Sequence, residues 1–239
     1  MAETETPEPG DRSLLRRIAD VAPAVAASTI TGGADLALFG SPSVGAMTPL
    51  AEVVVEKVVE ARLKRQQRML EQAAEQVGGV DRFAKLATAD DGRLELTARS
   101  IEAARRTTRE EKIRALARVL ANGVDGHASI DYSQILAGAI DSIEGPHIQV
   151  LAMVRDHANT QGGDFPPPDR AMSMTLETGI IAARMKSDMA VVGSVLQALS
   201  RQNLIEPVQG GLTYEQWGGA DRWAITQLGR QCLTLLEAA

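Results

Sequence analysis

Apolar side chains recur every three or four positions along most of the chain, the spacing that produces amphipathic helices. The longest such run covers 48–77, where Thr48-Pro49 suits a helix start and Gly78-Gly79 suits a stop. Shorter runs predict three more helices, over 91–106, 109–121 and 132–143. Four helices with short connections favour a bundle, which we place at 48–145.

Polar residues mark the expected ends of these helices. At the start of the third helix, Thr108 is expected to accept the amide proton of Glu111 while Glu111 reaches back, as a capping box. Asn122-Gly123 is expected to end that helix, and Asp131 to cap the fourth. The second helix is expected to bury Leu94, Ile101 and Ala104.

The last part of the chain changes from helices to a mixed pattern. Apolar spacing predicts helices over 146–157, 173–185 and 189–203, then two short strands at 204–208 and 222–225 around a glycine-rich stretch, and a closing helix over 227–237 capped by Thr226. The segments LSRQNLIEPV and RWAITQLGRQCLTLL resemble the third helix, first wing strand and Thr-x-x-Gly closing helix of the winged-helix fold. The predicted fold is therefore mostly α: a helical bundle followed by a C-terminal winged-helix domain at 146–239 with a small two-stranded wing.

The first 47 residues follow neither pattern. Residues 1–11, rich in proline and acidic side chains, are expected to be a disordered tail. Residues 12–47 form a small-residue-rich segment, in which proline, glycine and Asp35 interrupt every window long enough to span a bilayer. We expect a compact loop or helical hairpin here; the alternative is conditional membrane insertion or self-association. The candidate residues for that alternative are Gly32, Gly33, Gly40 and Gly45.

Composition and charge indicate a cytoplasmic protein, with residues 12–47 as the one reason to consider the periphery of the inner membrane. The single cysteine, Cys232, can form no internal disulfide, and the start of the chain lacks the pattern of a secretory signal. The net charge of −6 is uneven, since residues 57–118 carry fifteen Lys and Arg against ten Asp and Glu. This stretch contains a basic helix patch, for which a solvated helix face is the ordinary interpretation. The patch consists of Arg62, Lys64, Arg65 and Arg68.

The winged-helix resemblance implies a candidate nucleic-acid surface, because many such domains place their third helix in the major groove and the wing on phosphates. The candidate contacts are Lys186, Ser194, Gln197, Arg201, Gln202 and Arg222. Good DNA binders make about six to ten phosphate contacts, more than these cations supply. A protein-packing or structural winged helix is therefore the favoured interpretation, with Trp217 and Trp223 as anchors of the wing.

The chemistry-bearing residues do not form a catalytic pattern. His127, His147 and His157 lack the spacing of a zinc site on a helix, and Cys232 has no evident histidine partner. The glycine pairs lack the context of a phosphate-binding loop, and adjacent carboxylates lie at helix starts, where capping explains them. We expect no enzyme, no cofactor, no metal and no small-molecule substrate.

The order of these parts resembles the abortive-infection alpha-type proteins of bacteria and prophages. The features that carry the resemblance are the small-residue-rich start, the long charged helix, the segment TTREEKIRALARVLANG and the winged-helix end. The resemblance implies a non-enzymatic interaction protein in phage defence, acting by abortive infection or superinfection exclusion. A winged-helix transcriptional regulator and a self-associating helical scaffold are the alternatives. A protein partner or a homo-oligomer is expected, while DNA and a peripheral or conditional membrane contact stay open.

Overall fold

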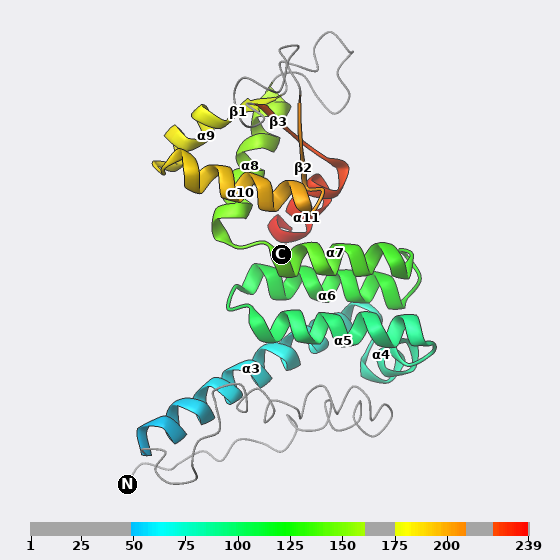
Figure 1. The fold of residues 1–239 in the computed structure, drawn as a ribbon. Coiled ribbons are helices and arrows are strands. Elements are labelled where there is room, and N and C mark those ends of the chain that lie inside the picture. Colours follow the sequence, from blue (N-terminus) through cyan, green and yellow to red (C-terminus); the bar gives the residue numbers. More distant parts are fainter. Residues whose placement is uncertain (1–48, 161–174, 209–221, 239) are drawn as a thin grey trace. The chain divides into compact units, whose positions relative to one another are not determined.

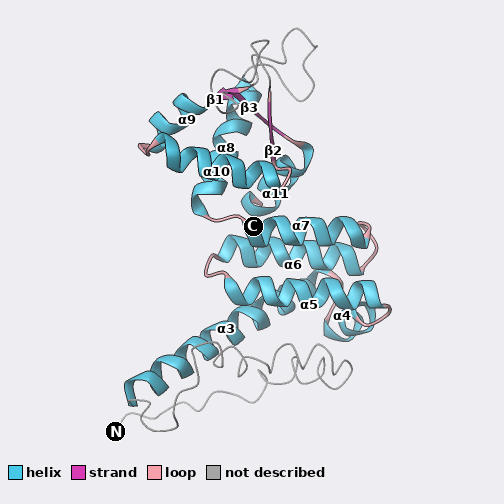
Figure 2. Ribbon diagram, viewed as in Figure 1, coloured by secondary structure: helices cyan, strands magenta, loops and turns pink. Residues whose placement is uncertain are grey.

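The computed structural model of the chain describes residues 49–160, 175–208 and 222–238 (Figure 1). These residues form nine helices and a small antiparallel sheet of three strands (Figure 2). The chain divides into two compact units, which we call unit 1 and unit 2, between Asp141 and Ser142. The expected tail, the segment with Gly32, Gly33, Gly40 and Gly45, and the stretch around Trp217 lie outside the described residues.

Unit 1 contains five described helices where the sequence predicts four. The helices α3, α5 and α6 pack against one another, and the short helix α4 packs against all three. The sequence did not predict α4, although its Phe83 is fully buried. Helix α6 lies at the centre of the core, with Leu116 and Leu120 fully buried. The bounds are α3 (Pro49–Gln76), α4 (Val80–Ala87), α5 (Asp91–Arg106), α6 (Glu110–Val124) and α7 (Ile130–Ser142).

The predicted end of the long helix is confirmed. Helix α3 stops at Gln76, and Gly78 and Gly79 follow it with φ values of 93° and 117°. Only glycine adopts such angles at little cost, because it has no Cβ. The amide of Gly79 donates to the carbonyl of Ala74 at 2.8 Å, so the pair turns the chain and satisfies a terminal carbonyl of the helix.

The capping box expected at Thr108 is wrong. Helix α6 begins at Glu110, its N-cap residue is Arg109, and no side chain caps it. The hydroxyl of Thr107, not of Thr108, accepts the amide N–H of Arg109 at 3.1 Å. The carboxylate of Glu111 accepts from Nε of Arg109 at 2.6 Å, and a hydrogen bond from its own amide, together with Arg109, lowers its pKa. Glu111 therefore pairs with a cation and does not reach back across the turn.

Two other helix boundaries also differ from the prediction. Helix α6 continues through Gly123 instead of ending there, and a Cβ at Gly123 would lie 2.4 Å from Cδ2 of Leu96. The glycine therefore allows α5 and α6 to approach closely; it is not a stop. Helix α7 is capped by Ser129, whose Oγ accepts from the amide of Tyr132 at 3.3 Å, and not by Asp131.

Among the described residues of unit 1, one cation lies in the core. Lys112 on α6 is 1% exposed, and its Nζ donates to the carbonyl of Asp141 at 3.0 Å. The ammonium group thereby satisfies a carbonyl in the last turn of α7, which has no partner within its own helix. Leu96 fills the core beside Ile101 and Ala104, while Leu94, which we expected there, is only half-buried.

Unit 2 combines four helices with the sheet. The central strand β3 pairs with β1 on one side and β2 on the other, both antiparallel, so the order is β1-β3-β2. The sequence predicted only two strands, because Leu176 and Glu177 were assigned to a helix that in fact begins at Thr178. The bounds are α8 (Gly145–Thr160), β1 (Leu176–Glu177), α9 (Thr178–Met185), α10 (Met189–Arg201), β2 (Ile205–Pro207), β3 (Arg222–Ile225) and α11 (Gln227–Glu237).

The closing helix α11 has the bounds that the sequence predicts, and Thr226 caps it as expected. Within the described ranges, none of the helices has both the length and the apolar character that crossing a membrane requires.

Candidate interaction surface on unit 2

The turn between α9 and α10 fixes the start of α10. Lys186 adopts a left-handed conformation (φ 52°), and its amide closes the end of α9 on the carbonyl of Ala183. Two residues later Asp188 caps α10, because its carboxylate accepts from the amide of Ala190 at 2.8 Å. The sequence offers either Ser187 or Asp188 as the cap of this helix, and the structure confirms Asp188.

One side of α10 is core and the other is exposed. The inward residues Val192, Val195, Leu196 and Leu199 are buried, as the apolar spacing predicts. The residues Ala190, Ser194, Gln197 and Arg201 follow one another at helical spacing on the opposite side, and all are exposed. We call these four residues the α10 stripe. The only polar contact described for their side chains is the bond from the Ser194 hydroxyl to the carbonyl of Ala190 at 3.0 Å.

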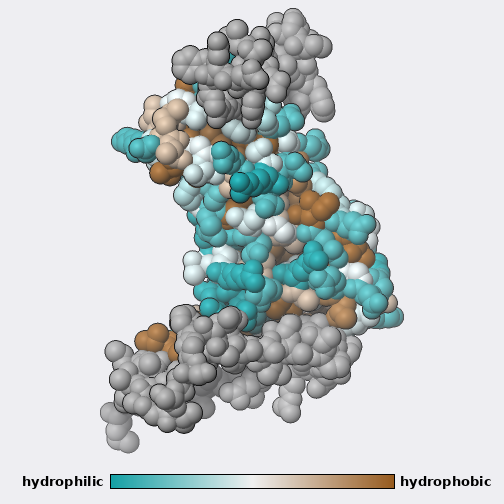
Figure 3. All heavy atoms as spheres, in the orientation of Figure 1, coloured by the Kyte–Doolittle hydropathy of each residue, from teal (hydrophilic) through white to brown (hydrophobic). Residues whose placement is uncertain are grey.

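Apolar side chains flank the first turn of the α10 stripe. Met189 and Val191 are each 53% exposed, and Ile180 on α9 is 41% exposed. Figure 3 shows tan and brown atoms in the region of α9. Large apolar residues this exposed are ordinary when single, but two in one turn of a helix, as Met189 and Val191 are, are typical of a contact surface.

The sheet holds α9 in place behind this surface. The indole Nε1 of Trp223 donates to Oγ1 of Thr178 at 3.1 Å, and Trp223 is 7% exposed. The neighbouring Arg222 pairs with Glu177 across the β1–β3 pair at 2.6 Å. The charge of Arg222 is thus matched within unit 2, which makes it a poor candidate for a phosphate contact.

The junction between α10, β2 and α11 depends on Thr226 and Gly229. The hydroxyl of Thr226 accepts from the amide of Gly229 at 3.1 Å and lies 2.6 Å from the carbonyl of Asn203. A Cβ on Gly229 would lie 2.1 Å from the carbonyl oxygen of Leu204. The Thr-x-x-Gly sequence therefore supplies both a cap and the space for the chain that leaves α10.

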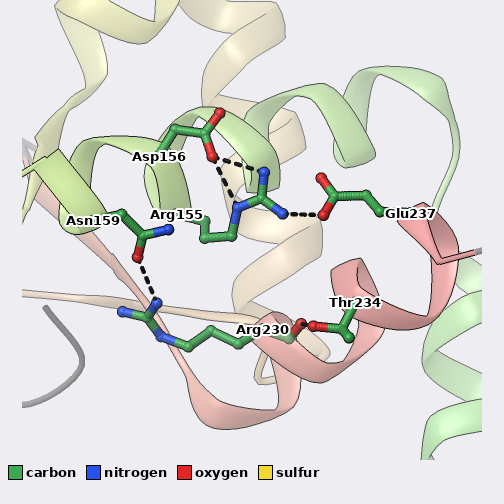
Figure 4. A network of polar contacts seen from close by, with 6 residues as sticks. All are labelled: Arg155, Asp156, Asn159, Arg230, Thr234 and Glu237. Atoms are coloured by element: carbon green, nitrogen blue, oxygen red, sulfur yellow. Dashed lines mark hydrogen bonds and ion pairs between the residues drawn. The ribbon is translucent and has the colours of Figure 1, made fainter.

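A polar network joins α8 to α11 on another side of unit 2 (Figure 4). The guanidinium of Arg155 lies between the carboxylates of Asp156 and Glu237, and these contacts, with Glu237 the stronger, raise the pKa of Arg155. Arg230 of α11 donates to Oδ1 of Asn159 at 3.1 Å. These cations hold two helices together, so they belong to the structure of unit 2 and not to its exposed cationic surface.

The candidate nucleic-acid residues are thus only partly brought together. Ser194, Gln197 and Arg201 share the α10 stripe, and Gln202 follows at its end. Lys186 lies before the other end of α10, while Arg222 is paired in the sheet. The sequence did not single out Met189, Val191 or Ile180; their exposure depends on which side of each helix meets the core.

The basic helix patch of unit 1 is largely matched by neighbouring groups. Lys64 pairs with Glu60 at 2.9 Å, and Arg68 pairs with Glu110 of α6. Arg65 donates to the carbonyl of Arg105 at 3.1 Å, and burial, with a smaller effect of Arg62, lowers its pKa. The patch therefore stabilises the packing of α3 and presents less free charge than its sequence suggests.

The described histidines and the cysteine occupy separate positions. Nε2 of His127 lies 3.2 Å from Asp125, and Nδ1 of His147 accepts from the amide of Glu144 at 3.1 Å. Burial raises the pKa of the Cys232 thiol to about 12, as expected for a small core residue. Within the described parts of the chain, no three His, Cys, Asp or Glu side chains gather as metal ligands.

A shallow pocket of about 180 Å³ lies beside the end of the α10 stripe in unit 2. It is lined by Ser142, Ile143, His147, Ala198, Arg201 and Gln202.

Comparison of the chain with protein-family models, with curated proteins and with solved structures finds no match. The exposed surfaces described above are therefore the basis for assigning a function.

Proposed function

We propose that the protein is a non-enzymatic interaction protein whose unit 2 is a winged-helix module that docks a partner protein through the α10 stripe. Support for the fold comes from the order of elements in unit 2: a helix, a short strand, two helices, and two strands that pair with each other. The strand order β1-β3-β2 and the position of α10 directly before β2 fit the same fold. In this proposal α10 is the third helix of the module.

The single observation that supports a protein partner, and not DNA, is the chemistry of the exposed side of α10. The stripe is uncharged over its first three residues, and Met189 and Val191 beside it are more than half exposed. Protein interfaces have an apolar centre enriched in methionine and aromatic residues, with arginine as the favoured cation. Arg201 at the far end of the stripe supplies that cation.

The same surface suits DNA less well. Strong DNA binders make about six to ten phosphate contacts, and the described part of unit 2 offers three exposed cations without a described carboxylate partner. These are Arg184, Lys186 and Arg201. Residues 209–221, which join the two strands of the proposed wing, include two acidic residues and no Lys or Arg. A wing of that composition repels phosphates.

Site-specific photo-cross-linking tests the proposal directly. A photoreactive phenylalanine is placed at Gln197 in the full chain, and a matched control carries it at Thr234, an exposed residue of α11. We expect one discrete protein adduct in cells from the Gln197 position, no adduct from Thr234, and loss of the adduct when Val191→Asp is added. Equal labelling from both positions, or none from Gln197, contradicts the proposal. Circular dichroism confirms that V191D remains folded.

DNA binding is the second candidate function, because Arg184, Lys186 and Arg201 have no acidic partner among the described residues. Its test is fluorescence anisotropy with a duplex of about three helical turns over a range of salt concentrations. The proposal of a protein partner predicts no binding beyond weak, sequence-independent attraction. A log–log salt slope of about −0.9 per phosphate contact, reduced in K186E and R201E, would establish DNA as the partner instead.

We also propose phage defence as the biological setting, supported by the order of parts along the sequence. Its test is the plating efficiency of a phage panel on bacteria that express the full chain or the V191D variant. We expect the full chain to reduce plaques of at least one phage and V191D to restore them. Equal plating with and without the chain across the panel contradicts this setting but leaves the cross-linking test unaffected.

A further inference from the structure

The apolar side of α3 continues beyond the part that the rest of unit 1 covers. Between residues 66 and 77 this side is core, with Leu70, Ala73 and Val77 at most 2% exposed. The same side continues toward the N-terminus as Leu63 and Val59, which are 38% and 40% exposed. We call residues 54–65 of this helix the α3 arm.

The α3 arm also exposes apolar side chains on the neighbouring side of the helix. Val54 is 53% exposed and Val58 is 43% exposed, although both carry β-branched side chains that gain free energy from burial. The arm therefore presents at least four partly exposed aliphatic side chains over about 18 Å of helix, at 1.5 Å per residue. Figure 3 shows brown atoms on this stretch of α3.

Charge along the helix indicates how a partner of the same sequence would lie. Up to Glu60 the helix carries Glu52, Glu56 and Glu60 against one lysine, so its first half is acidic. Residues 61–68 carry four cations and no acidic residue. Lys64 and Arg68 already pair with carboxylates, so the charges that count are those with no described ion pair, Glu56 and Arg62. Two parallel copies would place each of these beside its like, whereas two antiparallel copies place Glu56 of each helix beside Arg62 of the other.

We infer that the α3 arm is a self-association surface that pairs with the α3 arm of a second copy in antiparallel orientation. The pair is centred near Val59, the middle of the exposed stretch, so that Val55 of one copy approaches Leu63 of the other. Helix dipoles also oppose each other favourably in this orientation. The inference concerns unit 1 and goes beyond the proposed function, because it stands whether or not the α10 stripe docks a partner.

The covered surface is small for a permanent dimer. Stable interfaces bury about 1,200–2,000 Å² in total, and a single helix of this length from each copy reaches only the lower end of that range. Association should therefore be weak and depend on concentration, with the dimer populated in the micromolar range and above. Salt should weaken it further, because part of the orientation preference is electrostatic.

Sedimentation equilibrium of the full chain from about 1 to 100 µM tests the self-association. We expect a monomer–dimer equilibrium, and a shift of at least about tenfold toward monomer in Val58→Glu, because a carboxylate would enter an apolar seam. Ile135→Glu is the matched control: Ile135 on α7 is 54% exposed but lies on another helix. I135E should leave the equilibrium unchanged.

Thiol cross-linking tests the orientation. Val55→Cys and Leu63→Cys are prepared separately in the full chain, and the native Cys232 is buried and does not compete. A short bifunctional maleimide should join V55C to L63C in a mixture but should not join either variant to itself. Self-cross-linking of each variant would show a parallel pair and overturn the inferred orientation.

A monomer at all concentrations would overturn the self-association itself. In that case hydrogen exchange of the full chain distinguishes the remaining occupants of the α3 arm. Protection of residues 54–65 in the monomer would assign the surface to another part of the same chain. Protection that appears only with anionic lipid vesicles would assign it to a membrane. Either result replaces the second copy as the occupant.

Discussion

Replacing Gly229 with alanine should damage unit 2 in a way that the helix position alone does not suggest. Gly229 lies in the first turn of α11, where alanine is normally the better residue by about 1 kcal/mol. In this fold, however, the added Cβ would lie 2.1 Å from the carbonyl oxygen of Leu204 and 3.0 Å from Cγ1 of Ile225. The first of these atoms belongs to the backbone, so no rotamer change can relieve the contact.

The magnitude follows from what must move. Ordinary contact begins near 3.4 Å, so Leu204 and Gly229 would have to separate by more than 1 Å. The Leu204 carbonyl accepts from the amide and the hydroxyl of Thr226, both at 3.1 Å, and that shift breaks or strains both bonds. Overpacking costs about 1–3 kcal/mol, and each lost hydrogen bond about 1 kcal/mol. After subtracting the helix-propensity gain, we expect a net loss of about 2–4 kcal/mol in the free energy of unfolding.

Urea unfolding, followed by tryptophan fluorescence and far-ultraviolet circular dichroism, measures this loss. Gly193→Ala is the matched control, because Gly193 lies inside α10 of the same unit and a Cβ there would meet nothing within 4 Å. G193A should leave unfolding unchanged or raise its free energy by up to about 1 kcal/mol. If G229A unfolds at the same urea concentration as G193A, the close approach at Leu204 is not a constraint, and the reasoning is refuted.

Three further substitutions or treatments test other parts of the structure. Thr226→Ala removes the cap of α11 and should cost about 1–2 kcal/mol in the same urea assay; a change below a few tenths would show that the cap is unimportant. Lys112→Met keeps the aliphatic chain but leaves the Asp141 carbonyl without its buried donor, which should cost about 1–3 kcal/mol in thermal unfolding, and unchanged stability would contradict the burial of that bond. The Cys232 thiol has a pKa raised from 9.0 to about 12, so folding favours its neutral form, and stability should fall as pH rises from about 9 toward 12. At pH 8 the folded chain should react with a thiol reagent far more slowly than the denatured chain, and equal rates would place the thiol at the surface.

Local signals allowed much of the helical architecture to be predicted. Thr226 and Asp188 cap their helices as the sequence indicates, because a cap depends on residues only two or three positions away. The inward side of α10 was likewise predictable from the spacing of its four buried aliphatic residues. In these cases the physical cause lies within one turn of helix.

The errors have causes that lie outside the local sequence. Gly123 is a typical helix stop, but its role is set by Leu96 on a different helix, which needs the space of a missing Cβ. Thr108 has the spacing of a capping box, but Thr107 and Arg109 make competing contacts in the turn. Strand β1 is two residues long and exists only because β3, more than forty residues later, pairs with it.

The candidate surface was only partly predictable for the same reason. The polar residues of the α10 stripe could be named from the sequence, since the winged-helix resemblance identified their helix. Whether Met189 and Val191 face solvent depends on how α9 and the sheet pack against α10, which no local pattern states. The partners of Arg222 and Arg68 also come from distant elements, so their loss as free cations could not be foreseen.

The position of β3 at the centre of the sheet has a consequence for how unit 2 is made. Helices α8, α9 and α10 and strand β2 leave the ribosome before β3, yet the sheet that joins β1 to β2 cannot form until residues 222–225 have emerged. Until those residues are available, β1 and β2 lack the strand that both of them pair with, so the sheet is the last part of unit 2 to form. Unit 1 lacks this dependence, since its helices precede unit 2 in the chain. The protein therefore exists briefly with a finished bundle and an unfinished second unit, and a chain that stops before Arg222 would keep that state permanently.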